Sequence, residues 1–188
     1  MVSIISLWLP ILLSAVAVFI LSSIIHMVFV YHNNDFSKLP SEDQAMGDLG
    51  KANIPPGDYV MPYAANNKER QTPEFLEKMN KGPVAFITVF ESGPPKMGKQ
   101  LVLWFIYCII VGIFAAYVAG RALGPEDPYL SVFRFAGVTA FAGYGLALLQ
   151  NSIWYKRNWA ATFKSIFDSL IYALFTGGIF GWLWPVQM

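Results

Sequence analysis

Three ionisable side chains lie inside long apolar stretches: His26, Arg134 and Asp168. Such residues within membrane-spanning helices are candidate functional residues, because removing them from water is costly. The imidazole of His26 has the chemistry of a proton relay or a ligand-binding group. At about 100° per residue it shares a helix face with Ala15 and Ser22, and we therefore expect it to point inward. We expect His26 to form a hydrogen bond with a neighbouring hydroxyl or carbonyl group, and a role as proton relay or ligand is the alternative.

Arg134 and Asp168 are predicted to lie away from the packed faces of their helices. By the same angular rule, Arg134 points away from Gly143, and Asp168 points away from Gly177. The two lie near opposite membrane surfaces, so they cannot pair with each other. We expect both charged groups to reach the lipid headgroups, with Lys164 one turn before Asp168. The alternative is that these faces meet a partner subunit.

No metal site, cofactor site or catalytic residue is predicted. His26 and His32 are six residues apart in one segment, and a continuous helix would point them about 120° apart. The later spans contain no histidine, and neither a zinc-ligand spacing nor an HExxH motif occurs. The single cysteine, Cys108, cannot form an internal disulfide. A G-x-S-x-G motif is also missing, so we expect a protein that is not an enzyme.

Residues 93–99, with the sequence GPPKMGK, match the pattern G-x-x-x-x-G-K of a phosphate-binding loop. Such a loop holds phosphates with successive backbone N–H groups, and Pro94 and Pro95 have none. Gln100 stands where a serine or threonine would bind magnesium. The segment is therefore predicted to be a stiff, basic lead-in to a helix.

The composition indicates that these residues belong to a membrane protein. The 188-residue chain is 55% hydrophobic and only 13% charged, with a net charge of +1. A soluble domain carries about 25% charged residues. A net charge this small excludes nucleic acid as a partner on electrostatic grounds. The expected partners are the lipid bilayer and either other membrane subunits or further copies of the chain.

The elements that position these residues are four apolar stretches, each near or above the roughly 20 residues that a helix needs to cross a bilayer. They cover residues 4–31, 99–121, 130–152 and 163–184. The expected fold class is an all-α integral membrane protein with four transmembrane helices and one long polar loop between the first two. The chain is expected to divide into a first transmembrane helix (1–32), a cytoplasmic loop (33–98) and a three-helix transmembrane unit (99–188).

The loop is predicted to contain local structure. Ser41 to Gln44 has the spacing of a capping box and predicts a short helix. Thr72-Pro73-Glu74 predicts a second helix that stops at Gly82. Residues 84–90 can form a strand that pairs with residues 58–63, or they can lie on the membrane surface. With few apolar residues, the loop is expected to rest on the helix ends or on a partner instead of forming its own core.

Small residues recur every fourth position in the last three predicted spans. They are Gly112, Ala116 and Gly120, then Thr139, Gly143 and Ala147, then Ala173, Gly177 and Gly181. This spacing lets membrane helices approach closely. We expect these rows to pack the three helices against one another; the alternative is a seam between two copies of the chain.

Basic residues predict the orientation. Lys156 and Arg157 lie in the short connection between the third and fourth spans, whereas the opposite side holds Arg121 and Arg134. The positive-inside rule then places the long loop in the cytoplasm and both termini outside it.

The segments HMVFVYHNNDFSKLP, IPPGDYVMP, GPPKMGK, YVAGRALGP, SIWYK and FGWLWP resemble those of a group of uncharacterised bacterial inner-membrane proteins with four predicted spans. The resemblance implies a bacterial inner (plasma) membrane location, and it brings no activity and no site residue. The expected function is a non-enzymatic accessory or scaffold subunit of a larger membrane assembly. The alternative is a small homo-oligomeric transporter or channel that uses His26 and a helix break at Gly177-Gly178.

Overall fold

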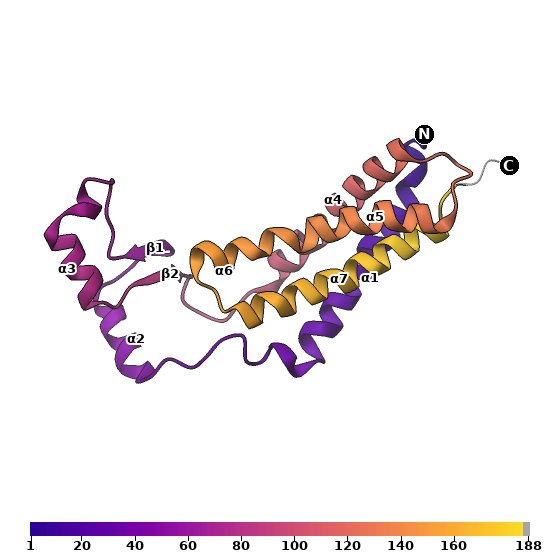
Figure 1. Ribbon diagram of the computed structural model, residues 1–188. Helices are drawn as coiled ribbons and strands as arrows, with labels where there is room; N and C mark the ends of the chain where they lie inside the picture. Colours follow the sequence, from indigo (N-terminus) through magenta and orange to yellow (C-terminus); the bar gives the residue numbers. More distant parts are fainter. Residues whose placement is uncertain (186–188) are drawn as a thin grey trace. The chain divides into compact units, whose positions relative to one another are not determined.

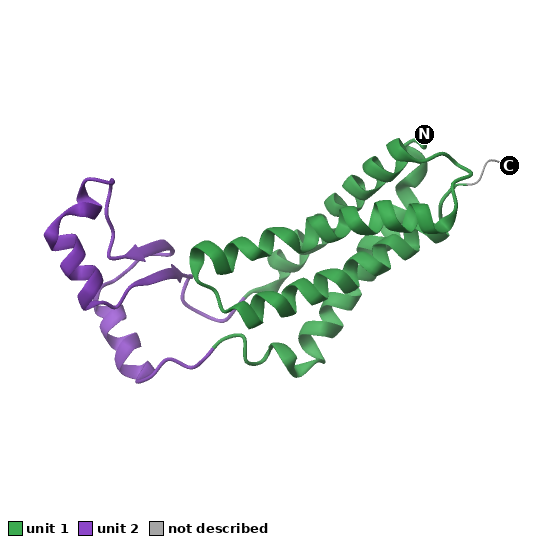
Figure 2. Ribbon diagram, in the orientation of Figure 1, with its two compact units in different colours: residues 1–36, 96–188 green, residues 37–95 purple. Residues whose placement is uncertain are grey.

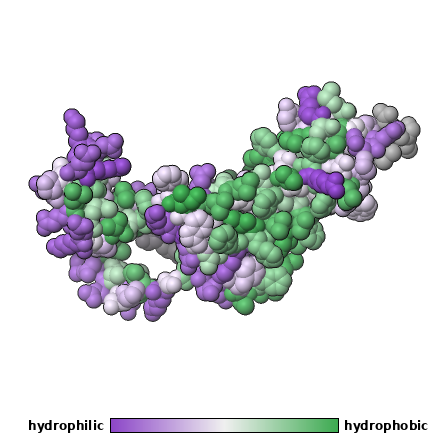
Figure 3. All heavy atoms as spheres, viewed as in Figure 1, coloured by the Kyte–Doolittle hydropathy of each residue, from purple (hydrophilic) through white to green (hydrophobic). Residues whose placement is uncertain are grey.

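The computed structural model describes residues 1–185 and is mostly helical. Four helical segments are long and apolar enough to cross a membrane, as the sequence predicts. These segments are Ile5–Met27, Met97–Ala122, Tyr129–Tyr155 and Trp159–Trp182 (Figure 1). Their outer surface is largely apolar in the view of Figure 3, which suits helices that face lipid.

The spans contain five α-helices and two 3₁₀ turns among the described residues. In chain order they are η1 (Ile5–Leu7), α1 (Trp8–Met27), α4 (Met97–Ala122), α5 (Tyr129–Tyr144), η4 (Leu146–Leu148), α6 (Leu149–Tyr155) and α7 (Trp159–Trp182). The four spans pack in a closed ring, in which α1 and α5 each contact both α4 and α7. Each long helix therefore buries residues toward two neighbours.

The third span is interrupted at Gly145, where a continuous helix was expected. A Cβ atom at Gly145 would lie 3.0 Å from the side chain of Ser169 in α7, so the glycine allows this close approach. The Ser169 hydroxyl donates a hydrogen bond of 3.1 Å to the carbonyl of Tyr144. A carbonyl freed by the interruption thus gains a partner inside the bundle, as a membrane helix requires.

Residues 37–95 form a compact unit of their own, distinct from the unit of residues 1–36 and 96–188 (Figure 2). Its elements are α2 (Glu42–Lys51), β1 (Gly57–Met61), η3 (Glu69–Gln71), α3 (Pro73–Lys81) and β2 (Ala85–Val89). The two strands pair antiparallel, with Gly57 opposite Val89 and Met61 opposite Ala85. The segment between the first two spans thus contains two short helices and the hairpin that the sequence offered as a possibility.

The two predicted helix starts in this unit have different outcomes. Thr72 caps α3 by accepting a hydrogen bond from the backbone N–H of Phe75, and the helix stops at Gly82 as predicted. Ser41 precedes α2 with a left-handed backbone (φ 53°), and its side chain makes no capping hydrogen bond. The prediction of a capping box is therefore wrong, although the predicted helix forms.

Two rows of small residues lie between helices of the same chain. In α4, a Cβ atom at Gly112 would contact Ile11, and one at Gly120 would lie 2.7 Å from the carbonyl of Val2, while Ala116 is fully buried. In α7, Ala173 and Gly177 are buried against α5, and Gly181 lies beneath the ring of Tyr129.

The row expected in the third span is not the packed face of α5. Its buried positions include Val132, Ala136 and Ala140, because α4 and α7 enclose that side. Thr139 instead donates a hydrogen bond back to a carbonyl of its own helix, and Ala147 lies in η4 with an exposed side chain. Gly143 is exposed, but it still lies next to α4, because a Cβ atom at this position would be 3.2 Å from the side chain of Val111.

Candidate functional site: a buried polar cluster between α1 and α7

The candidate site is a cluster of polar side chains where the end of α1 meets α7. Helix α1 stops at Met27, and Phe29 adopts an extended backbone (φ −85°, ψ 132°) that turns the chain out of the helix. The 3₁₀ turn η2 (Val30–His32) follows. It places Tyr31 and His32 in contact with Asp168 of α7. All of these residues belong to the same compact unit.

Asp168 is the centre of the cluster and is only 2% exposed. One carboxylate oxygen accepts a hydrogen bond from the Tyr31 hydroxyl, and the other lies 2.9 Å from Nε2 of His32. The expectation that Asp168 reaches the headgroups is therefore wrong. Helix α7 has packed neighbours on two sides, with α5 on the Gly177 side and α1 on the Asp168 side. The face opposite the small residues is thus also buried.

Asp35 and Lys164 extend the cluster beyond His32. Nδ1 of His32 lies 2.7 Å from one carboxylate oxygen of Asp35, and Nζ of Lys164 donates to the other at 2.9 Å. Lys164 also donates to the Tyr31 carbonyl and to the side-chain oxygen of Asn34, both at 2.5 Å. The lysine thereby ties the segment after α1 to the first turns of α7. Lys164 contacts Asp35, whereas Asp168 is held by Tyr31 and His32.

The surroundings of Asp35 and Tyr31 shift the pKa values of these two side chains in opposite directions. Burial by itself raises the pKa of the Asp35 carboxyl, but the hydrogen bonds and charges of His32 and Lys164 outweigh it and hold that pKa below its usual value. Burial, together with the hydrogen bond to Asp168, raises the pKa of the Tyr31 hydroxyl far above its usual value. Asp35 is therefore an ionised acceptor at neutral pH, and Tyr31 is a neutral donor.

His26 lies at the exposed edge of this cluster, and the expectation that it points into the bundle is wrong. Its ring centroid is 4.7 Å from that of His32, at an interplanar angle of 47°. The separation of about 120° assumed one continuous helix through both residues. Because α1 ends at Met27, His32 instead turns back toward His26.

The cluster also brings together three potential metal ligands. One ligand atom each from His26, His32 and Asp168 lie within 4.8 Å of one another. The angular argument against a pair of ligating histidines therefore fails. The arrangement has two chemical capacities: it can hold a divalent cation, or it can join α1 to α7 through buried charge pairs.

Arg134 stays outside the cluster. It is exposed on α5, beside a hollow of about 200 Å³ that is lined mainly by apolar side chains, including Val138 and Leu170. Helix α7 is continuous through Gly177 and Gly178, so the break expected there is absent. Close contact of Gly177 with the carbonyl of Phe133 supports the helix at that point.

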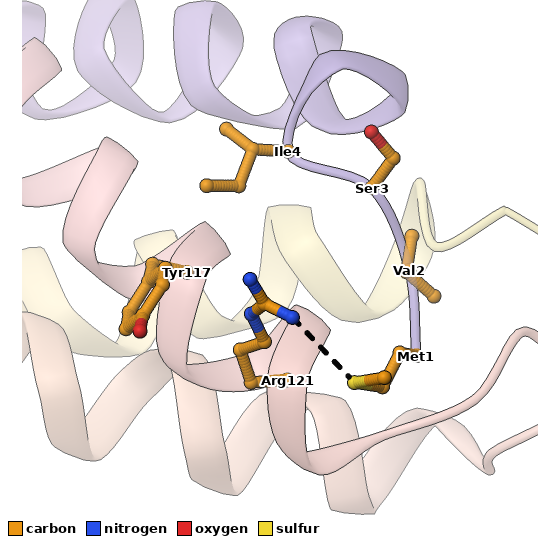
Figure 4. A pocket seen from close by; sticks show the side chains of 6 residues that line it. All are labelled: Met1, Val2, Ser3, Ile4, Tyr117 and Arg121. Atoms are coloured by element: carbon orange, nitrogen blue, oxygen red, sulfur yellow. Dashed lines mark hydrogen bonds between the residues drawn. The ribbon is translucent and has the colours of Figure 1, made fainter.

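A second hollow, of about 390 Å³, lies at the other end of α1 (Figure 4). Arg121 is the one charged side chain among its described lining residues, and its guanidinium group lies 5.7 Å from the ring centroid of Tyr117. It also contacts the sulfur of Met1 at 3.8 Å. Its described lining includes the hydroxyls of Ser3 and Tyr117 but no acid and no histidine, so no base stands beside these hydroxyls to activate them.

Sequence reasoning missed Tyr31, Asn34 and Asp35, and it gave Lys164 only a local role. One signal was present: the run of polar residues directly after the first span and the pair Lys164 and Asp168 fall at the same predicted membrane surface. Their contact depends on the end of α1, which the apolar pattern alone places several residues too late.

No family model matches the chain, and no curated protein and no solved structure matches it either.

Proposed function

We propose that the protein is a non-enzymatic accessory or scaffold subunit of a larger assembly in a bacterial inner membrane. The long segment after α1 faces the cytoplasm and both termini lie outside it. The partners are the lipid bilayer and other membrane subunits or further copies of the chain, and nucleic acid is not among them.

The observation that carries this proposal is the exposed apolar surface of residues 37–95. The structure describes this whole segment, and Ala64 is its one buried residue. Many of its large apolar side chains remain exposed, including Leu49 (44%), Leu76 (49%), Val84 (53%) and Phe90 (78%). A folded aqueous unit that leaves these groups uncovered has a surface suited to a partner.

The alternative, a homo-oligomeric transporter or channel, depends on His26 and on a broken fourth span. Helix α7 runs from Trp159 to Trp182 without interruption. The unwound backbone that this alternative places in the fourth span is therefore absent there, and the one interrupted span among the described residues is the third, at Gly145. His26 lies beside other ionisable groups at one end of the bundle.

The first test is the composition of the native particle. The full chain, tagged and extracted in mild detergent, is expected to elute with at least one other membrane protein in fixed stoichiometry. Mass photometry and protein identification give the composition. A particle that contains only copies of this chain contradicts the accessory role, and flux assays in liposomes then test the transporter alternative.

A pair of variants on α3 tests the exposed apolar surface. Leu76→Ser removes an apolar contact, and we expect co-purification of the partner to fall about tenfold, as for the loss of roughly 1–2 kcal/mol at an interface. Lys78→Ser changes a side chain about 200° around the same helix and is the matched control. Equal retention of the partner by both variants would show that this face is not the interface.

A further inference from the structure

We propose that His26, His32 and Asp168 form a binding site for a divalent transition-metal ion, oriented by Asp35 and Tyr31. The site joins the end of α1 to α7. The inference is separate from the accessory role, because it concerns the chemistry of this cluster and does not depend on a partner protein.

The first argument is the balance of charge. Two buried carboxylates, Asp35 and Asp168, lie on either side of His32, and Lys164 pairs with Asp35 only. The side-chain exposures of the two carboxylates are 8% and 3%. Buried charges are stable when they are paired or bind a metal ion. Among the described residues Asp168 thus has no lysine or arginine partner of its own, and a cation bound between Asp168 and His32 would supply the missing positive charge.

The second argument is the geometry of the donor atoms. Nε2 of His32 and the nearer oxygen of Asp168 are 2.9 Å apart. Two ligands of a tetrahedral zinc ion with bonds of about 2.0–2.1 Å are about 3.3 Å apart, so this pair needs only a small separation to accept the ion. The ring of His26 lies at the exposed edge of the cluster. There it can rotate and bring its ligand nitrogen closer to the ligand atoms of His32 and Asp168, all three of which lie within 4.8 Å of one another.

The third argument is the set of groups behind the ligands. In metal sites, the second nitrogen of a ligating histidine usually donates to a carboxylate, which fixes the ring and its tautomer. Nδ1 of His32 has this partner in Asp35, which Lys164 holds in turn. The second oxygen of Asp168 accepts a hydrogen bond from Tyr31. These contacts leave Nε2 of His32 and one oxygen of Asp168 facing a common point.

The donor set indicates the class of ion. Two imidazoles and one carboxylate suit zinc and the divalent iron, cobalt and nickel ions, whereas calcium and magnesium prefer all-oxygen sites. Three protein ligands leave a coordination position open at the exposed His26 side for water.

The test uses the full chain in detergent with a tag that contains no histidine. After removal of metal with a chelator, Zn²⁺ is titrated against a chromophoric competitor, and Co²⁺ reports the ligand field by its visible absorption. We expect one ion per chain. Asp35→Asn should weaken zinc binding about 10–100-fold, as for other groups that orient a ligating histidine, and His26→Gln and Asp168→Asn should weaken it at least as much.

The matched control is Asp48→Asn, which removes a carboxylate from an exposed pair with Lys51 and should leave zinc binding unchanged. His26→Gln changes an exposed side chain, so it keeps the test decisive if Asp168→Asn does not fold. Gel filtration and thermal melting without metal check folding. The assignment is overturned if the wild-type chain does not bind zinc, or if His26→Gln binds zinc and cobalt as the wild type does.

Discussion

At the residue scale, the polar cluster shows how a buried aspartate is accommodated in an apolar helix. Asp168 has a phenol donor on one oxygen and an imidazole on the other. Asp35 repeats the arrangement with the other imidazole nitrogen and a lysine. Each carboxylate thus has two hydrogen-bonding partners, as buried polar groups require. His32 connects the two carboxylates.

Removing the lysine tests whether the cluster stabilises the bundle. Lys164→Met leaves Asp35 with His32 as its remaining side-chain partner and removes the hydrogen bonds to Tyr31 and Asn34. We expect the free energy of unfolding to fall by about 2 kcal/mol, because the Asp35 carboxylate loses one of its two partners and the charge-assisted hydrogen bonds of Lys164 are lost. Thermal melting in detergent measures the loss.

The control for this prediction is Lys99→Met, which changes an exposed lysine in the first turn of α4. It should change the free energy of unfolding by less than about 1 kcal/mol. Similar melting of the two variants would show that the contacts of Lys164 contribute little.

At the element scale, α7 packs against α5 on one side and α1 on the other, and it contacts the two in different ways. Its small residues face α5 closely enough that a Cβ atom at Gly177 would lie 2.7 Å from the carbonyl of Phe133 and 3.2 Å from Cα of Gly137. Its other side carries Asp168 toward the end of α1. The helix therefore combines close backbone packing on one side with hydrogen bonds on the other.

Adjacent glycines in α7 provide a matched test of this packing. Gly177→Ala forces α5 and α7 apart, and we expect it to destabilise the bundle by about 1–3 kcal/mol, as overpacking does. Gly178→Ala places its Cβ atom 3.6 Å from the hydroxyl of Tyr129, an ordinary contact, and should be neutral or slightly stabilising. Melting temperatures in the same detergent compare the two, and equal values would contradict the packing seen between these helices.

At the scale of the whole molecule, the connections determine which ends of the spans share a membrane surface. The end of α1, the start of α4, the end of α6 and the start of α7 lie on one side, and the segment 124–128 lies on the other. The polar cluster, at the end of α1, is therefore on the same side as the Lys156-Arg157 connection. By the positive-inside rule we predict that this is the cytoplasmic side.

Cysteine labelling tests this orientation. In a Cys108→Ala background, Asn67→Cys and Glu126→Cys each add one exposed thiol, and these lie on opposite predicted sides. In intact cells, a membrane-impermeant maleimide should label Glu126→Cys and should reach Asn67→Cys only after permeabilisation. The reverse pattern would place the segment 37–95 outside the cytoplasm.

The sequence by itself determined the number of spans and the helix that starts at Pro73, and it offered the pairing of the two strands as one of two alternatives. Each of these depends on local signals: apolar runs long enough for a bilayer, a threonine cap with a proline after it, and runs of β-branched and aromatic residues. Such signals act within a few residues, so a linear pattern contains them.

Tertiary structure alone decided which helix faces are buried and how the polar cluster forms. Angular rules assign one inward face to each helix, but α7 has neighbours on two sides, which buries Asp168 as well as Gly177. The meeting of His26 with His32 depends on the early end of α1 at Met27, and the contact of His32 with Asp168 joins residues 136 positions apart. Contacts this distant in the chain follow from the packing of the helices, which no local pattern encodes.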